Sequence, residues 1–73
     1  MPTLQTEVNS PIMEARILKA ARAHFRQRKN IHAYYEHGQW WILRANEIDF
    51  TKTYSVVDAE GPGTIDGFCF EEV

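Results

Sequence analysis

The spacing of apolar and polar positions along the chain changes once, near Asn30. From Pro11 to about Lys29 the apolar residues recur at intervals of three and four, which is typical of one face of an α-helix. That face comprises Met13, Ile17, Leu18, Ala21, His24 and Phe25. Ser10 and Pro11 form a helix-start signal, because a serine oxygen accepts from a free N–H and proline has none to satisfy. The pattern predicts one amphipathic helix over residues 10–29, with Asn30 as its C-cap.

Beyond Asn30 the chain consists of short stretches rich in aromatic and β-branched residues, separated by glycine-containing turns. Strands are predicted over residues 31–36, 39–45, 51–58 and 65–73, with Gly67 as a possible bulge. His37 and Gly38 have the two-residue length of a tight hairpin loop. The predicted fold is α+β, with one N-terminal helix packed on a three- to four-stranded antiparallel meander in two layers. A small, partly closed barrel with the helix at its mouth is the alternative.

The chain length of 73 residues predicts one small domain over residues 1–73. Within it, residues 1–9 are expected to be a poorly ordered leader, residues 10–29 a helix and residues 31–72 an antiparallel sheet. A chain this short buries only about 60% of the surface that it exposes when unfolded. Its one cysteine, Cys69, excludes an internal disulfide, and no Cys/His spacing indicates a structural zinc. Small chains without such crosslinks often gain stability by oligomerising.

Two aromatic doublets flank the predicted hairpin turn. Neighbouring side chains of a strand point to opposite faces of a sheet, so a two-residue turn pairs Tyr35 with Trp40 on one face and Tyr34 with Trp41 on the other. The first face carries Ala33, Tyr35, Trp40 and Ile42. The second carries His32, Tyr34, Trp41 and Leu43. The fourth strand is expected to direct Ile65 and Cys69 away from Phe68 and Phe70.

One helix covers only one face of such a sheet, and an uncovered apolar face is typical of a binding site. The small side chain of Ala33 leaves room for the helix on its own face. The predicted partner-binding residues are therefore His32, Tyr34, Trp41 and Leu43. The sequence leaves three possibilities for what covers this second face. They are residues 1–9 through Leu4 and Val8, a second copy of the chain, or a different protein. The pattern favours a protein–protein interaction module, with a homodimer as the first possibility. The alternative is that all of these aromatic residues serve only as core.

The charges divide between the two halves of the chain. Residues 1–46 contain seven Lys/Arg and three Asp/Glu, a net +4, whereas residues 47–73 contain one Lys and seven Asp/Glu, a net −6. A basic helix face is an alternative site for nucleic acid, although the overall charge of −2 opposes it. That face comprises Arg16, Lys19, Arg22, Arg26 and Lys29. A second alternative is an acidic regulator or inhibitor of a basic partner. Its residues are Asp58, Glu60, Asp66, Glu71 and Glu72.

Other classes of function find little support in the sequence. No histidine lies in a context typical of a catalytic base, and no Ser or Cys lies in a nucleophile motif. The carboxylates around Gly61 lack the spacing of an EF-hand, and no apolar run approaches the roughly 18 residues of a membrane span. The N-terminus has neither the basic start nor the apolar block of a signal peptide. The expectation is a non-enzymatic cytoplasmic protein without cofactor or metal, with Cys69 kept reduced.

Overall fold

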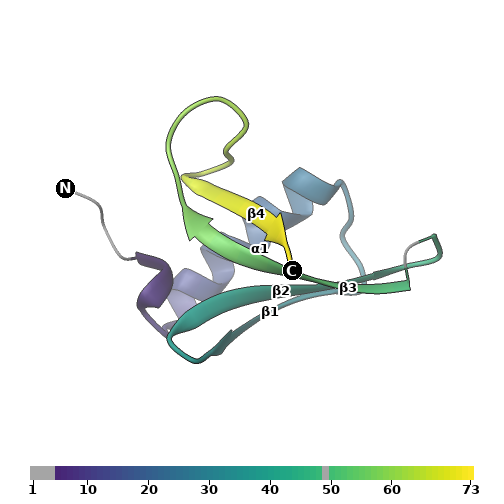
Figure 1. Cartoon of the computed structure of the whole chain (residues 1–73), viewed down its shortest axis with the longest axis horizontal. Helices are drawn as coiled ribbons and strands as arrows, with labels where there is room; N and C mark the ends of the chain where they lie inside the picture. Colours follow the sequence, from purple (N-terminus) through teal and green to yellow (C-terminus); the bar gives the residue numbers. More distant parts are fainter. Residues whose placement is uncertain (1–4, 49) are drawn as a thin grey trace.

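The structure, a computed structural model, describes residues 5–48 and 50–73. Its elements are η1 (Gln5–Glu7), α1 (Pro11–Phe25), β1 (Ile31–Glu36), β2 (Gln39–Asn46), β3 (Phe50–Asp58) and β4 (Phe68–Glu72). The strands form one antiparallel sheet in the order β1-β2-β3-β4, and α1 lies across one face of it (Figure 1). The predicted two-layer α+β meander is confirmed. The barrel alternative is wrong, because the sheet is open with β1 and β4 at its edges.

The start of α1 follows the predicted capping chemistry, but its end does not. The Oγ of Ser10 accepts a hydrogen bond from the N–H of Met13 at 3.1 Å, and Pro11 is the first helical residue. The helix ends at Phe25, four residues before the predicted end, because Arg26 adopts a left-handed conformation with φ 54°. Asn30, the predicted C-cap, lies beyond the helix.

The side chain of Gln27 holds the loop that follows α1. Its amide donates to the carbonyl of Lys29 at 2.8 Å and to the carbonyl of Ala45 at 2.7 Å. The first bond closes the loop on itself, and the second attaches it to β2. These side-chain bonds replace the backbone bonds that a longer helix would have made, and they explain why the predicted helix over 10–29 is wrong at its C-terminal end.

The register of the first hairpin is the predicted one. Tyr35 lies opposite Trp40, and Tyr34 lies opposite Trp41. The turn between them has positive φ at both central positions, 57° at His37 and 70° at Gly38, as the favoured two-residue hairpin turns require. Each aromatic doublet therefore sends one side chain to each face of the sheet.

The last strand is shorter than predicted. Ile65 and Phe68 exchange two backbone hydrogen bonds, of 3.1 and 3.0 Å, around Asp66 and Gly67. Both central residues have positive φ, 55° and 83°, so Gly67 serves a tight turn and not a bulge. The turn brings Ile65, half-buried, against the core. The prediction that Ile65 faces away from Phe68 within one strand is therefore wrong.

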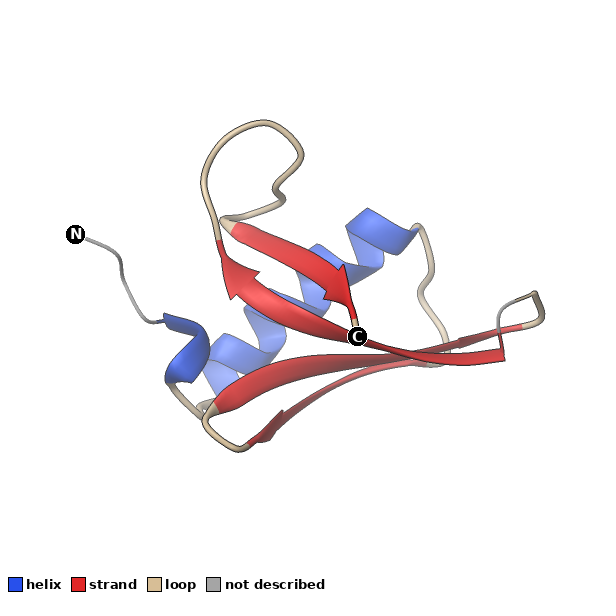
Figure 2. Cartoon of the chain, viewed as in Figure 1, coloured by secondary structure: helices blue, strands red, loops and turns tan. Residues whose placement is uncertain are grey.

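The core fills the space between α1 and the sheet (Figure 2). Its buried residues are Met13, Ile17, Ala20, Ala21, Ile31, Trp40, Ile42, Tyr54, Val56, Phe68 and Phe70. The two small alanines let the helix backbone approach the larger side chains of the strands. His24, predicted on the apolar helix face, is exposed, and its ring lies at the edge of the core with its centroid 4.7 Å from that of Phe25. The helix covers the sheet face that carries Ala33, as predicted from the small side chain of that residue.

The segment before α1 packs on the helix side of the sheet. The indole Nε1 of Trp40 donates to the carbonyl of Val8 at 2.8 Å, and the hydroxyl of Tyr35 donates to the carbonyl of Glu7. The N–H of Thr6, which is buried, donates to Asp58 at 3.3 Å. Residues 5–8 are thus tied to the sheet and are not a poorly ordered leader.

Residues 1–9, through Leu4 and Val8, were one of three possible covers for the second face, and the placement of residues 6–8 does not support that possibility. Tyr35 and Trp40 belong to the covered face, so the segment that binds their polar tips extends the helix layer. The side chain of Val8 is 52% exposed. Leu4 lies outside the described residues.

Candidate functional site

The face of the sheet opposite α1, which we call the open face, is defined by the strand register. Its side chains are those of His32, Tyr34, Glu36, Gln39, Trp41, Leu43, Ala45, Thr51, Thr53, Ser55, Val57, Cys69 and Glu71. All four residues predicted to bind a partner lie together here, with His32 directly opposite Leu43 and Tyr34 directly opposite Trp41. Directly opposite side chains on one face of an antiparallel pair are close enough to pack. The four residues therefore form one continuous strip across β1 and β2, and their binding of a partner stays a prediction.

The strip is less exposed than the sequence alone suggested. His32 is exposed, whereas Tyr34, Trp41 and Leu43 are half-buried. The indole Nε1 of Trp41 donates to the carbonyl of Glu36 at 3.0 Å, which holds the ring along the hairpin. The strip therefore presents a partly apolar surface whose three largest side chains are only partly accessible.

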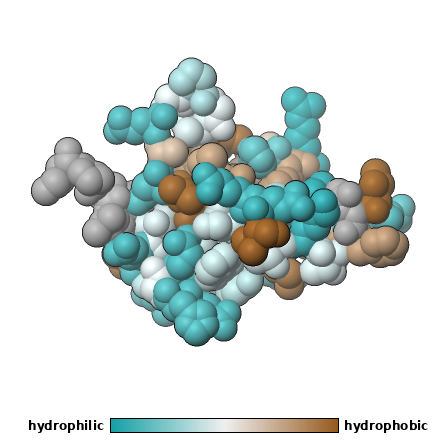
Figure 3. Space-filling model, in the orientation of Figure 1, coloured by the Kyte–Doolittle hydropathy of each residue, from teal (hydrophilic) through white to brown (hydrophobic). Residues whose placement is uncertain are grey.

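The charge of the open face is low compared with the rest of the molecule. Of its thirteen side chains two are carboxylates, Glu36 on β1 and Glu71 on β4, and none is a lysine or arginine. Thr53 and Ser55 border the aromatic strip on the β3 side. In Figure 3, where the sheet lies in front of the helix, brown hydrophobic areas are small and separated by pale and teal ones.

Two highly exposed large apolar side chains lie together at one end of the sheet and were not singled out from the sequence. Ile48 is 85% exposed and Phe50 is 77% exposed, at the turn that joins β2 to β3. This turn is the far tip of the long hairpin in Figure 1. Two large apolar residues within a predicted connection are the signal that would have identified this tip.

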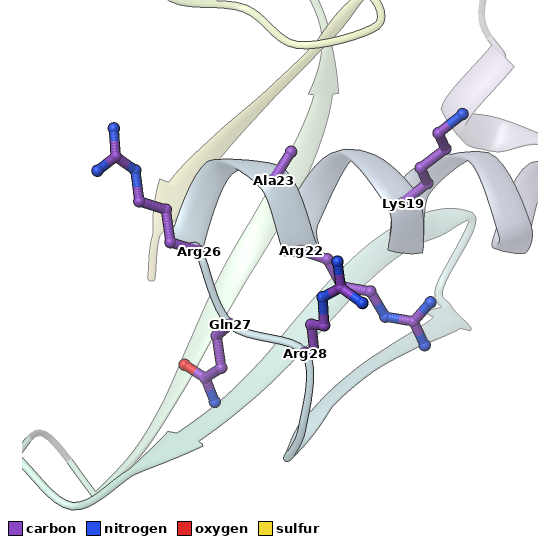
Figure 4. A pocket seen from close by; sticks show the side chains of 6 residues that line it. All are labelled: Lys19, Arg22, Ala23, Arg26, Gln27 and Arg28. Carbon is purple, nitrogen blue, oxygen red and sulfur yellow. The ribbon is translucent and has the colours of Figure 1, made fainter.

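A second surface is a groove at the C-terminal end of α1, which we call the basic groove. Its volume is about 560 Å³, and it is lined by Lys19, Arg22, Ala23, Arg26, Gln27 and Arg28. Figure 4 shows these side chains extending from the last turns of α1 and from the loop that follows. In the described part of the chain, none of the ion pairs involves a basic residue of the groove. The C-terminal end of a helix carries partial negative charge, which favours this gathering of cations.

The basic groove differs from the basic helix face predicted from the sequence. Lys19, Arg22 and Arg26 line it, whereas Arg16 and Lys29 do not. Arg16 lies 3.7 Å from the carboxylate of Asp66, and its guanidinium carbon is 5.3 Å from the centroid of the Phe68 ring. Arg28 was missed, because it enters the groove only as a result of the early end of α1.

The acidic residues do not gather into one surface. Asp58 accepts from Thr6, Asp66 pairs with Arg16, and Glu72 pairs with Lys52 at 3.1 Å. Glu71 and Glu72 are neighbours in β4 and point to opposite faces, while Glu60 is exposed in the loop before Ile65. Most of the predicted acidic surface is therefore engaged in contacts within the chain.

Within residues 5–48 and 50–73, no group of three or more His, Cys, Asp or Glu side chains is placed to hold a metal ion. Cys69 is a free thiol, half-buried on β4. Over the same residues, α1 falls short of the length and apolar character that a membrane-crossing helix requires. Comparisons with models of known families, with curated proteins and with solved structures found no match to this chain.

Proposed function

We propose that the protein is a non-enzymatic protein–protein interaction module that self-associates through its open face. One observation carries this proposal. Both layers that cover the sheet, α1 and residues 5–8, lie on the same side of it, so no described residue covers Tyr34, Trp41 and Leu43. Tryptophan and tyrosine are among the residues that contribute most to the binding energy of protein interfaces.

The low charge of the open face favours a second copy as the partner. A two-fold dimer brings the same surface of each copy together, so a strongly charged face would repel itself. The carboxylates of this face, Glu36 and Glu71, lie on the two edge strands β1 and β4 and leave the strip between them without a fixed charge. Two sheets pack face to face at a separation of about 10 Å. A strongly basic or acidic partner, by contrast, would find little complementary charge on the strip.

The dimer is expected to be weak. The key side chains are half-buried already, so burying the rest of each contributes on the order of 1 kcal/mol, while association itself costs about 4–15 kcal/mol. An interface of ordinary size takes about 800 Å² from each partner, compared with 5174 Å² for the whole surface of this chain. These values together predict a dissociation constant in the micromolar range or weaker.

Sedimentation velocity over a concentration range from about 10 μM to about 1 mM tests the proposal. The wild-type protein is expected to shift from monomer towards dimer, and Leu43→Lys is expected to stay monomeric throughout. The matched control is Ile12→Lys, which replaces a side chain that is 75% exposed on α1 and adds the same charge. Circular dichroism confirms that both variants fold.

The control should dimerise as the wild-type protein does. A wild-type protein that stays monomeric at the highest concentration would overturn the proposal. A dimer that Leu43→Lys leaves intact would also overturn it, since the copies would then meet through another surface.

The proposal also includes the compartment. We place the protein in the reducing cytoplasm, which is supported by Cys69, the one cysteine of the chain and a free thiol in the structure. Its position on the open face means that oxidation of the thiol would add a polar group to the proposed interface.

A further inference from the structure

The basic groove lies on the other side of the molecule from the proposed dimer interface. It is lined by α1 and the loop that follows, and α1 covers the sheet face opposite the open face. A dimer formed through the open faces would therefore carry one groove on each outer side. The groove shares no residue with the open face, so binding at the groove does not depend on self-association.

The four cations of the groove are spaced for a chain of anions. Lys19 lies on α1 and Arg26 is the left-handed residue that caps its end, so they are about 10 Å apart along the helix axis at 1.5 Å per residue. One strand of nucleic acid carries a phosphate about every 3.4 Å of helix axis, so this length matches about three phosphates. Arg22 lies between Lys19 and Arg26 on α1, and Arg28 lies on the loop. In Figure 4, Lys19 and Arg26 extend to one side of the helix, and Arg22 and Arg28 extend to the other.

The lining of the groove restricts the kind of anion. Ala23 is its only apolar side chain, and it contains no aromatic ring on which a base could stack. The large exposed apolar residues that insertion into a lipid surface would need lie elsewhere. Guanidinium and ammonium groups that contact phosphate alone position a nucleic acid without reading its sequence.

We propose that the basic groove binds the phosphate backbone of nucleic acid without sequence preference, through Lys19, Arg22, Arg26 and Arg28. The expected affinity for nucleic acid depends on two opposing electrostatic contributions. Three to four phosphate contacts favour binding, while the net charge of −2 opposes it. The expected dissociation constant is that of non-specific binders, about 10⁻⁴–10⁻⁶ M.

Fluorescence anisotropy with end-labelled oligonucleotides of about 20 nucleotides tests the proposal, using oligo-dT, oligo-dA and a mixed-sequence duplex. The logarithm of the association constant is expected to fall with the logarithm of salt concentration with a slope of about −2 to −4. The oligo-dT and oligo-dA probes are expected to bind equally. The double variant Arg22→Gln/Arg28→Gln should weaken binding by about tenfold or more and make the slope shallower by about 1.5.

The matched control is Arg16→Gln/Lys29→Gln. It removes the same charge from the two basic residues that were predicted from the sequence but lie outside the groove. It is expected to change the affinity by less than about threefold, because it alters only the long-range electrostatic attraction and removes no contact within the groove. Circular dichroism and a thermal melt check that both double variants fold.

Several results would overturn the proposal. One is the absence of binding at low salt, and another is an equal loss of affinity in the two double variants. A strong preference for one base would contradict contact with phosphate alone. Tighter binding to phosphatidylserine vesicles than to any oligonucleotide would show instead that the groove recognises a lipid surface.

Discussion

Each face of the sheet receives one tyrosine and one tryptophan from the aromatic doublets of β1 and β2, but only one face is covered. Trp40 is 2% exposed beneath the helix layer, whereas its chain neighbour Trp41 is half-buried on the open face. Tyr35 and Tyr34 also lie on opposite faces, although both are half-buried. Since one backbone step separates the members of each doublet, their different environments come from strand geometry and from the one-sided placement of the cover. Aromatic content by itself therefore does not distinguish core from surface here.

The polar tips of the aromatic side chains show the same contrast. On the covered face, Trp40 and Tyr35 donate to carbonyls of Val8 and Glu7, 32 and 28 residues away in the chain. On the open face, Trp41 donates to Glu36 of its own hairpin, five residues away. The covered aromatics thus hold distant segments together, and the open one makes only a local contact.

The largest expected effect compares the two tryptophans directly. Trp40→Ala is expected to lower the free energy of unfolding by about 3–5 kcal/mol, because it leaves a cavity in the core and removes the bond to Val8. Trp41→Ala is expected to cost about 1 kcal/mol, as for a partly exposed position. Urea denaturation at a concentration where the protein is monomeric measures both. Equal losses would contradict the assignment of the two faces.

A smaller effect compares a serine of the helix layer with a serine of the open face. Ser10→Ala removes the oxygen that accepts from the N–H of Met13, so it is expected to lower the free energy of unfolding by about 1 kcal/mol. Ser55→Ala, on the open face, is expected to change it by less than about 0.5 kcal/mol. Thermal melts of the two variants check this, and a larger loss for Ser55→Ala would show that the open face contributes more to folding than this structure indicates.

The parts of the fold that depend on neighbouring residues were predictable from the sequence. The two-residue turn at His37-Gly38 determines the register of the first hairpin, and alternation along the strands then assigns the aromatic doublets to their faces. The Ser10-Pro11 signal correctly marked the start of α1. The tight turn before β4 was missed, because Gly67 was interpreted as a bulge, although Asp66-Gly67 is a strong signal for a two-residue turn.

The parts that depend on distant contacts were not predictable. The helix ends early where the Gln27 amide reaches the carbonyl of Ala45, a partner 18 residues away that no local pattern indicates. The inclusion of Arg28 in the basic groove follows from that ending. In the same way, the position of residues 5–8 depends on the polar tips of Tyr35 and Trp40, whose bonding partners appear only once the sheet has formed.

The central claim is that two copies meet through their open faces. Isotope-filtered nuclear Overhauser spectroscopy on an equal mixture of labelled and unlabelled protein, at about 1 mM, tests it directly, because only contacts between copies produce signals. The account predicts signals between the Trp41 indole of one copy and the Leu43 methyl groups of the other. Intermolecular signals confined to Ile48 and Phe50 at the hairpin tip, or no intermolecular signals at all, would contradict it.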